Sequence, residues 1–157
     1  MTPKPNAPAF PPVAAPANPA RIMSYDHVGI RVSNRDLALR FYERLGFAES
    51  VVFPDYEANE MVSAAGVRIN LIFNATTRPD ARNVLLDEPI KLPGVTHPAF
   101  IVDDLAALED WLVQEGIRIT EGPHRIGPRR IALFIRDPDG NVLEFNQLVQ
   151  DTREADA

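Results

Sequence analysis

The sequence predicts an α+β fold in which two βαβββ modules pair and their mixed sheets curve into a half-barrel. An internal repeat, and the same order of strand and helix patterns in each copy, indicate this architecture. The repeat is weak by identity, but its landmarks keep register. The following pairs are each 70 positions apart: His27 and His97, Val32 and Val102, Phe41 and Trp111, Gly46 and Gly116. A repeated unit that cannot bury its apolar face alone is stabilised by packing against its copy.

Each copy begins with a strand that a helix follows. The segments 25–32 and 96–102 are short, rich in β-branched or apolar residues, and alternate in polarity, which is typical of strands. Leucine and aromatic residues then recur at helical spacing. Capping residues precede each of these segments and a glycine ends it: Ser33, Asn34 and Gly46 in the first copy, Asp103, Asp104 and Gly116 in the second.

Three further strands complete each module. We expect them at 48–53, 60–65 and 67–73 in the first module, and at 117–121, 130–136 and 141–148 in the second, where the turn 137–140 joins the last two. The final strands begin at Gly66 and Gly140, an offset of 74, which aligns Glu144 with Asn70. The modules therefore span 21–75 and 94–149, with a linker at 76–93 and a C-terminal tail at 150–157.

The composition of the chain limits the classes of partner that it is expected to bind. The chain of 157 residues carries 16 basic and 22 acidic side chains, a net charge of −6, which argues against nucleic acid or a membrane surface as the main partner and favours a small-molecule substrate. It has no cysteine, which excludes thiolate metal sites and is compatible with a cytoplasmic location. Residues 1–20 contain seven Pro and six Ala and predict a disordered tail, with a Pro-rich docking motif as the alternative, rather than a secretory signal.

Strand alternation predicts which polar side chains share a surface. The apolar residues of each strand must face a helix, which turns the residues between them to the opposite, concave face. Four strands contribute to this face. We expect it to carry His27 and Arg31, His97, Glu144, and Arg68 with Asn70. An arginine on that face should pair with a carboxylate or bind an anion, because an unpaired cation there is costly.

The paired βαβββ pattern, a histidine in the first strand of each module, and the closing motif DPDGNVLEF resemble the vicinal-oxygen-chelate superfamily. This group includes glyoxalase I, bleomycin-resistance proteins and extradiol dioxygenases, and the resemblance covers residues 22 to about 149. It implies a divalent metal held by His27, His97 and Glu144, with Asn70 at a fourth position that is often Glu. A His/His/Glu set with open positions favours Fe(II) or Mn(II), and Zn or Ni also fits.

Other site residues follow from the same resemblance. The stretch from His124 to Glu144 resembles the extradiol dioxygenase signature, but Phe134 stands where a tyrosine is expected, so a hydrogen-bond donor is missing. His124, expected in a loop before the seventh strand, is the candidate catalytic acid or base. Arg130 either anchors an anionic substrate or solvates a sheet edge. Asn70 is a candidate for binding substrate, because an amide offers no carboxylate base.

These residues support a metal-dependent enzyme whose small substrate chelates the ion through two neighbouring oxygens. Extradiol-like ring cleavage and a glyoxalase-like lyase or isomerase reaction are the leading alternatives, and transfer of a thiol to an epoxide is a third. A metal-free sequestering protein of the bleomycin-resistance type is the alternative from another class. The resemblance also implies a homodimer, and it leaves open whether His27 and His97 meet within one chain or across two.

Overall fold

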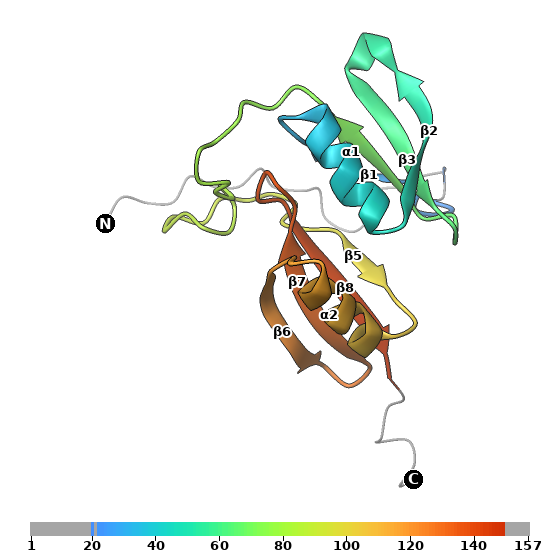
Figure 1. The fold of residues 1–157 in the computed structure, drawn as a ribbon, viewed down its shortest axis with the longest axis vertical. Helices are drawn as coiled ribbons and strands as arrows, with labels where there is room; N and C mark the ends of the chain where they lie inside the picture. Colours follow the sequence, from blue (N-terminus) through green and yellow to red (C-terminus); the bar gives the residue numbers. More distant parts are fainter. Residues whose placement is uncertain (1–19, 21, 150–157) are drawn as a thin grey trace, which may run out of the picture.

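A computed structural model describes residues 20 and 22–149 of the chain. Their strands form two four-stranded sheets, each with one helix over it (Figure 1). The first module contains β1 (Val28–Arg31), α1 (Arg35–Arg44), β2 (Phe47–Phe53), a short 3-10 turn (Pro54–Tyr56), β3 (Ala58–Ser63) and β4 (Arg68–Ile72). The second contains β5 (Ala99–Ile101), α2 (Leu105–Gln114), β6 (Ile119–Ile126), β7 (Arg130–Arg136) and β8 (Val142–Leu148).

Both modules have the same topology. The strand orders are β1-β4-β3-β2 and β5-β8-β7-β6, and in each sheet the first strand runs parallel to the last while the other pairs are antiparallel. A parallel pair needs a crossover, and the helix of each module lies within that connection. The predicted fold class, two βαβββ modules with mixed sheets, is confirmed.

The strand register confirms the two offsets found in the sequence. In the first module Gly29 lies opposite Asn70, and in the second Ala99 lies opposite Glu144. The first strands therefore correspond at an offset of 70 and the last strands at 74. As a result, Asn70 and Glu144 occupy equivalent positions in the two sheets.

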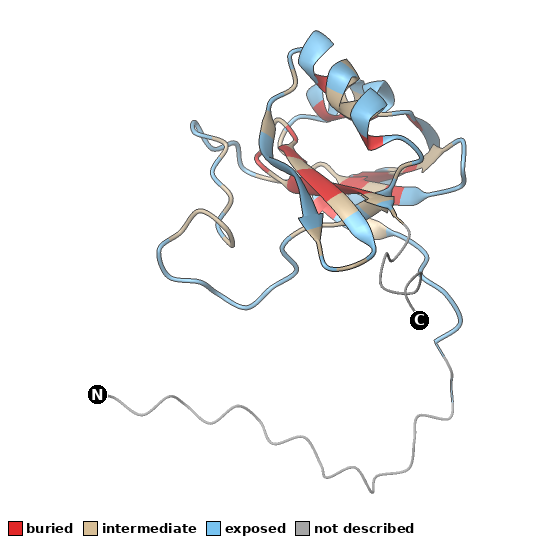
Figure 2. Cartoon of the chain, turned by 90° about the horizontal axis from the view of Figure 1, so that it is seen from below, coloured by how far each residue is buried: buried red, intermediate tan, exposed pale blue. Residues whose placement is uncertain are grey.

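Each helix begins at a side-chain cap and covers one face of its sheet. Asn34 accepts a hydrogen bond from the backbone N–H of Leu37, and Asp104 accepts one from Ala107, both at 2.9 Å. Such caps satisfy backbone donors that the first helical turn leaves free. Buried residues concentrate where the helices meet the sheets (Figure 2). A single apolar cluster runs through both modules, and its fully buried members include Val32, Tyr42, Met61, Ile69, Leu71, Leu112, Leu133, Ile135 and Leu143.

The turn between β7 and β8 joins the two modules. Asp139 accepts hydrogen bonds from the backbone N–H of Ser33 at 2.8 Å and from its hydroxyl at 2.5 Å. Asp137 accepts one from the buried Tyr42 hydroxyl at 2.9 Å, and the Asn141 amide donates to the Arg31 carbonyl at 3.0 Å. These bonds tie the DPDG segment to β1 and α1 of the other module. We call residues 137–141 with these partners the turn latch.

Three details differ from the sequence-based expectations. His27 and His97 precede β1 and β5, which are shorter than the predicted strands. The prediction that His124 lies in a loop is wrong: β6 extends to Ile126, and His124 pairs with Ala132 of β7. The strand predicted to end at residue 121 continues past Gly122 and Pro123, and its pairing shifts register between Glu121 and His124.

The segment between β4 and β5 contains no helix or strand and contacts the second module. Arg136 of β7 donates two hydrogen bonds to the Asp87 carboxylate, at 2.5 and 2.7 Å. The ion pair with Arg136 lowers the pKa of Asp87 well below its usual range. Gly140 lies so close to this segment that a Cβ there would collide with the Ala81 carbonyl oxygen. The predicted tails, 1–20 apart from Ala20 and 150–157, lie outside the described residues.

Among the described residues, no helix has the length and apolar character needed to cross a bilayer.

Candidate metal centre

The candidate centre lies on the sheet faces that the helices leave uncovered. In β8, Leu143 and Phe145 join the helix-covered core, so Glu144 points to the other face. In β4, Ile69 and Leu71 are fully buried in the same core, so Asn70 also points to the other face. We call these surfaces the open face of each module.

His97 and Glu144 meet on the open face of the second module. The Nε2 atom of His97 lies 2.8 Å from Oε2 of Glu144. Glu144 is almost fully buried, and its other oxygen, Oε1, is inaccessible and has no hydrogen-bond partner. A buried carboxylate oxygen without a partner is costly unless a cation or donor completes it. This pair therefore offers one imidazole nitrogen and one carboxylate to a shared ligand.

Both candidate histidines are oriented in the same way by the residue that precedes them. His27 donates from Nδ1 to Oδ2 of Asp26 at 2.7 Å, and Nδ1 of His97 is hydrogen-bonded to the Thr96 hydroxyl at 2.9 Å. The hydrogen bond from His27 lowers the pKa of Asp26. Nε2 is the second nitrogen of each ring, and in His97 it contacts Glu144. A partner on one ring nitrogen that fixes the other is the usual arrangement around metal-binding histidines.

The three predicted ligands do not converge within one chain. Among residues 20 and 22–149, no group of three or more His, Asp or Glu side chains is placed to hold a metal ion. His27 belongs to the first module, and 40% of its side chain is exposed. The structure brings His97 and Glu144 together and leaves His27 on the other module.

Two aromatic side chains extend the second module's open face. Phe134 of β7 lies directly opposite Glu144, and its ring centroid is 5.6 Å from that of His97. His124 of β6 lies on the far side of Phe134, with ring centroids 6.4 Å apart. His124 also lies 3.5 Å from the Glu121 carboxylate. Phe134 thus lies next to both His97 and His124. Phe134 supplies an apolar surface beside the histidine-carboxylate pair and no hydroxyl donor.

The open face of the first module is more polar. Glu60 of β3 lies directly opposite Asn70, and its carboxylate is 3.6 Å from Nε of Arg68. The Asn70 side-chain oxygen is buried and has no hydrogen-bond partner. Sequence reasoning singled out Asn70 and Arg68 but missed Glu60. Glu60 is the first residue of a predicted strand. Its place next to the apolar Met61 was the available indication that its side chain points away from the core.

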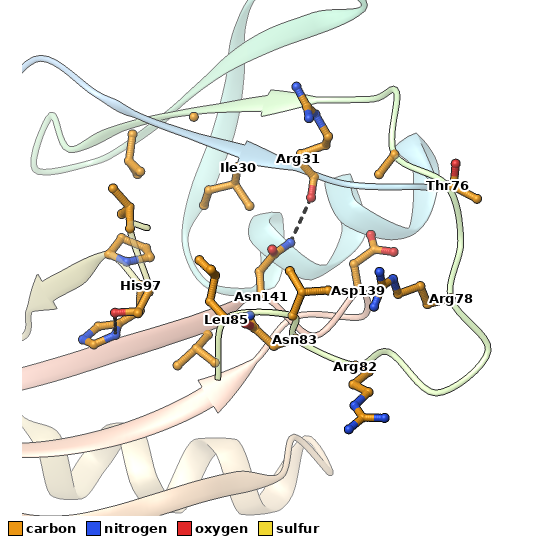
Figure 3. Close-up of a pocket in the computed structure, with 18 of the residues that line it drawn as sticks. Ile30, Arg31, Thr76, Arg78, Arg82, Asn83, Leu85, His97, Asp139 and Asn141 are labelled. Carbon is orange, nitrogen blue, oxygen red and sulfur yellow. Dashed lines mark hydrogen bonds between the residues drawn. The ribbon is translucent and has the colours of Figure 1, made fainter. Parts of the chain in front are cut away.

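Two clefts follow the seam between the modules, and His97 lines both. The larger, of about 630 Å³, lies between β1, the linker and the start of β8 (Figure 3). Arg31 lines it, with its side chain extending away from Asn141. The other, of about 590 Å³, includes Arg68 and the segment 97–100. Arg130 lines neither cleft: it is exposed at the start of β7, opposite Leu148.

The sequence matches the Glyoxalase/Bleomycin resistance protein/Dioxygenase superfamily over residues 24–145. The chain belongs to this superfamily. The match spans both modules and ends just after Glu144. The resemblance inferred from the repeated histidines and the DPDG motif is thereby confirmed. The superfamily contains many metalloenzymes, and its members generally bind a divalent metal.

Individual superfamily relatives agree with this assignment. The chain is 33% identical over 132 residues to Virulence protein STM3117 of Salmonella typhimurium, covering 79% of this chain and 83% of the relative. It is 27% identical over 124 residues to Metallothiol transferase FosB of Shouchella clausii, covering 77% of each. The crystal structure of STM3117 matches with a TM-score of 0.60 at 28% identity, over 83% of this chain and all of that chain.

A glyoxalase/dioxygenase structure from Nostoc punctiforme matches with a TM-score of 0.65, over 90% of this chain and all of that chain. At 18% identity this match supports the shared fold alone.

Proposed function

We propose that this protein is a divalent-metal-dependent enzyme acting on a small substrate that presents two neighbouring oxygens to the ion. The observation that carries the proposal is the contact between His97 Nε2 and Glu144 Oε2 at 2.8 Å. The donor set fits a metal, because the second oxygen of Glu144 is buried without a partner and imidazole and carboxylate are common ligands of Fe(II), Mn(II), Zn(II) and Ni(II). Such an ion polarises substrate oxygens and stabilises negative charge that develops on them.

We propose that His27 completes the set from a second copy of the chain. Its Nδ1 is held by Asp26, as Nδ1 of His97 is held by Thr96, so Nε2 of His27 could take the role that Nε2 of His97 has beside Glu144. The first strands β1 and β5 each form a sheet edge. Large apolar side chains near these edges, Tyr25 and Ile101, are 79% and 69% exposed. A symmetric dimer that joins these edges would cover them and bring the two open faces together.

The remaining residues shape the substrate site. Phe134 provides an apolar wall beside His97, and His124 is placed to exchange protons with a substrate lying on that wall. Arg31 and Arg68, which line the clefts that His97 shares, would attract an anionic group of the substrate. Arg130 lies farther along β7 and serves only a substrate long enough to reach the end of that strand.

Three reactions fit this arrangement. Ring cleavage of a catechol and a glyoxalase-like proton transfer both begin with a chelated pair of oxygens. The absence of a hydroxyl on Phe134 counts against the first reaction, because substrate oxygen loses a donor. The similarity to FosB, a metallothiol transferase, adds transfer of a thiol to an epoxide. A catechol panel with Fe(II) under anaerobic reconstitution, the hemithioacetal of methylglyoxal, and fosfomycin with a thiol separate the three.

The metal itself is tested first. Protein purified without chelators should hold Fe, Mn, Ni or Zn at close to one ion per chain, or be reconstituted to that level. His97→Ala should lose the metal, whereas His124→Ala, which removes the histidine on the far side of Phe134, should retain it. A wild-type chain that is free of metal and cannot be reconstituted would support a metal-free sequestering protein instead. That second candidate is favoured by the separation of His27 from the other two ligands within one chain.

A subunit-mixing experiment tests the shared site. His27→Ala and His97→Ala chains, each unable to bind metal alone, should regain about a quarter of the wild-type metal content when equal amounts are unfolded together and refolded, because about half of the dimers are then mixed. In a mixed dimer one of the two sites keeps both histidines. A mixture that regains no metal would place all three ligands in one chain and contradict the proposed dimer.

A further inference from the structure

We propose that Glu60 is a catalytic base that removes a proton from the carbon between the two chelating oxygens of the substrate. The inference rests on the proposed metal-dependent function and adds the substrate class: small α-hydroxycarbonyl compounds. It also supplies a carboxylate to a module whose fourth ligand position, residue 70, holds a neutral asparagine.

The strand register places Glu60 on the open face of the first module. Its neighbours in β3, Asn59 and Met61, are fully buried, so alternation turns Glu60 to the other side. It lies directly opposite Asn70, which in turn lies opposite Gly29, two residues beyond His27. Directly opposed side chains in an antiparallel pair start about 5 Å apart. A carboxylate at residue 60 therefore reaches the surroundings of residue 70 from the neighbouring strand.

The equivalent position in the second module indicates which part of the site Glu60 can reach. Glu60 opposes Asn70 as Phe134 opposes Glu144, so Glu60 and Phe134 occupy equivalent positions. In the second module the ring of Phe134 lies 5.6 Å from that of His97. Glu60 therefore occupies the position whose equivalent in the second module, Phe134, contacts His97, the proposed metal ligand.

The surroundings of Glu60 hold it in place without enclosing it. The Ser50 hydroxyl donates a hydrogen bond to Oε1 at 2.8 Å, and Arg68 lies 3.6 Å from Oε2, beyond hydrogen-bond distance. The side chain is 22% exposed. One oxygen is therefore fixed, and the other faces the Arg68 guanidinium while its lone pairs stay available to a substrate proton.

The proton transfer is balanced without an external oxidant or reductant. The C–H bond next to the carbonyl breaks, its proton passes to Oε2 of Glu60, and its electron pair delocalises onto the carbonyl oxygen. Return of the proton to the neighbouring carbon, with the hydroxyl proton passing to the former carbonyl oxygen, gives the isomeric hydroxycarbonyl compound. Return to the same carbon gives back the substrate, and in D₂O this step exchanges hydrogen for deuterium.

Two probes of matched shape test this role in the zinc-loaded protein. Hydroxyacetone carries a CH₂ group between its oxygens, and NMR in D₂O follows the exchange of those hydrogens. Acetohydroxamate carries an N–H in the same place and cannot lose a carbon-bound proton there, so calorimetry reports only its binding. Glu60→Gln should abolish exchange and weaken acetohydroxamate binding about 10- to 100-fold, because a charge-assisted hydrogen bond is lost.

The control is Glu43→Gln, which removes the same charge from an exposed position on α1 and should leave both readouts unchanged. Zinc content and melting temperature are measured for all three proteins. Equal exchange and equal acetohydroxamate affinity in wild type and Glu60→Gln would overturn the assignment while leaving the metal centre intact. A zinc-loaded wild type that neither exchanges hydroxyacetone nor binds acetohydroxamate would also overturn it. A wild type that binds no zinc defeats the proposed function itself, and Glu60 with it.

Discussion

The two modules share a backbone plan but present different chemistry on their open faces. In the second module, His97 contacts Glu144 beside an aromatic wall formed by Phe134. At the equivalent positions the first module carries His27, Asn70 and Glu60. The register at these positions is the same in both modules, so there the difference lies in the side chains. Under the proposed function, the duplicated fold supplies positions, and substitutions at those positions would divide the tasks between a face that holds an ion and a face that handles substrate.

The largest contrast is expected at the paired positions 70 and 144. Glu144→Gln keeps the volume of a buried side chain but removes the anionic ligand, so near-stoichiometric metal should be lost. Asn70→Ala should change metal affinity by no more than about tenfold, the lower range for groups outside the ligand set. Metal content after dialysis, with competition against a chromogenic chelator, measures both. If the two variants lost equal amounts of metal, positions 70 and 144 would contribute equally to metal binding, and the proposed contrast between the modules would be wrong.

Positions 42 and 112 are equivalent in the two helices, and both side chains are fully buried. Leu112→Ala should lower the free energy of unfolding by about 2–5 kcal/mol, because it removes apolar volume and leaves a cavity in the core. Chemical denaturation measures the change. Val113→Ala, one residue along and 68% exposed, should have little effect. A small loss for Leu112→Ala would show that this helix contributes little to the shared core.

Tyr42→Phe keeps the ring and removes the hydroxyl that donates to the turn latch. The Asp137 carboxylate is buried, and burial raises its pKa, so the loss of one donor there should cost about 1–3 kcal/mol. Thermal unfolding provides the comparison, with Tyr56→Phe at an exposed site as the control. If Tyr42→Phe unfolds like the wild type, the bond between the modules is not a source of stability.

The smallest effect should come from the linker. The pKa of Asp87 is lowered from 3.8 by Arg136, so the folded state favours the charged carboxylate. The stabilisation is complete above the unfolded pKa and is lost as pH falls through the lower, folded pKa. The stability difference between wild type and Asp87→Asn should be under about 1 kcal/mol, since the pair is partly exposed, and should shrink below pH 3.8.

Melting temperatures between pH 7 and pH 3 follow this difference. Arg136→Gln should reproduce it, and the double variant should lose no more than either single one. Additive losses would indicate that Asp87 and Arg136 stabilise the protein independently.

Much of the fold was predictable because local signals agreed. Alternation along the strands and caps at Asn34 and Asp104 indicated the elements, and two constant offsets aligned Glu144 with Asn70, as the strand register confirms. The pairing of His97 with Glu144 follows from the same alternation. These features depend on residues near one another in the sequence or on a repeat that is visible in it.

Features that depend on long-range packing were not predictable. A Gly-Pro pair in β6 looks like a break, yet pairing with β7 carries the strand past it, which places His124 in the sheet. Glu60 becomes a candidate site residue only once its cross-strand neighbour, Asn70, is known. The DPDG segment was identified as a turn, but its contacts with Ser33 and Tyr42 link residues about a hundred positions apart, which no local pattern reveals.

The turn latch has a consequence for proteolysis. It holds the modules together through β7 and β8, while the exposed stretch 89–96 connects them only covalently. Trypsin cutting after Lys91 would leave Asp87 bound to Arg136 and the latch intact. The nicked protein should therefore run as two fragments on a denaturing gel and as one particle under native conditions, so the halves would remain partners after the chain that joins them is gone.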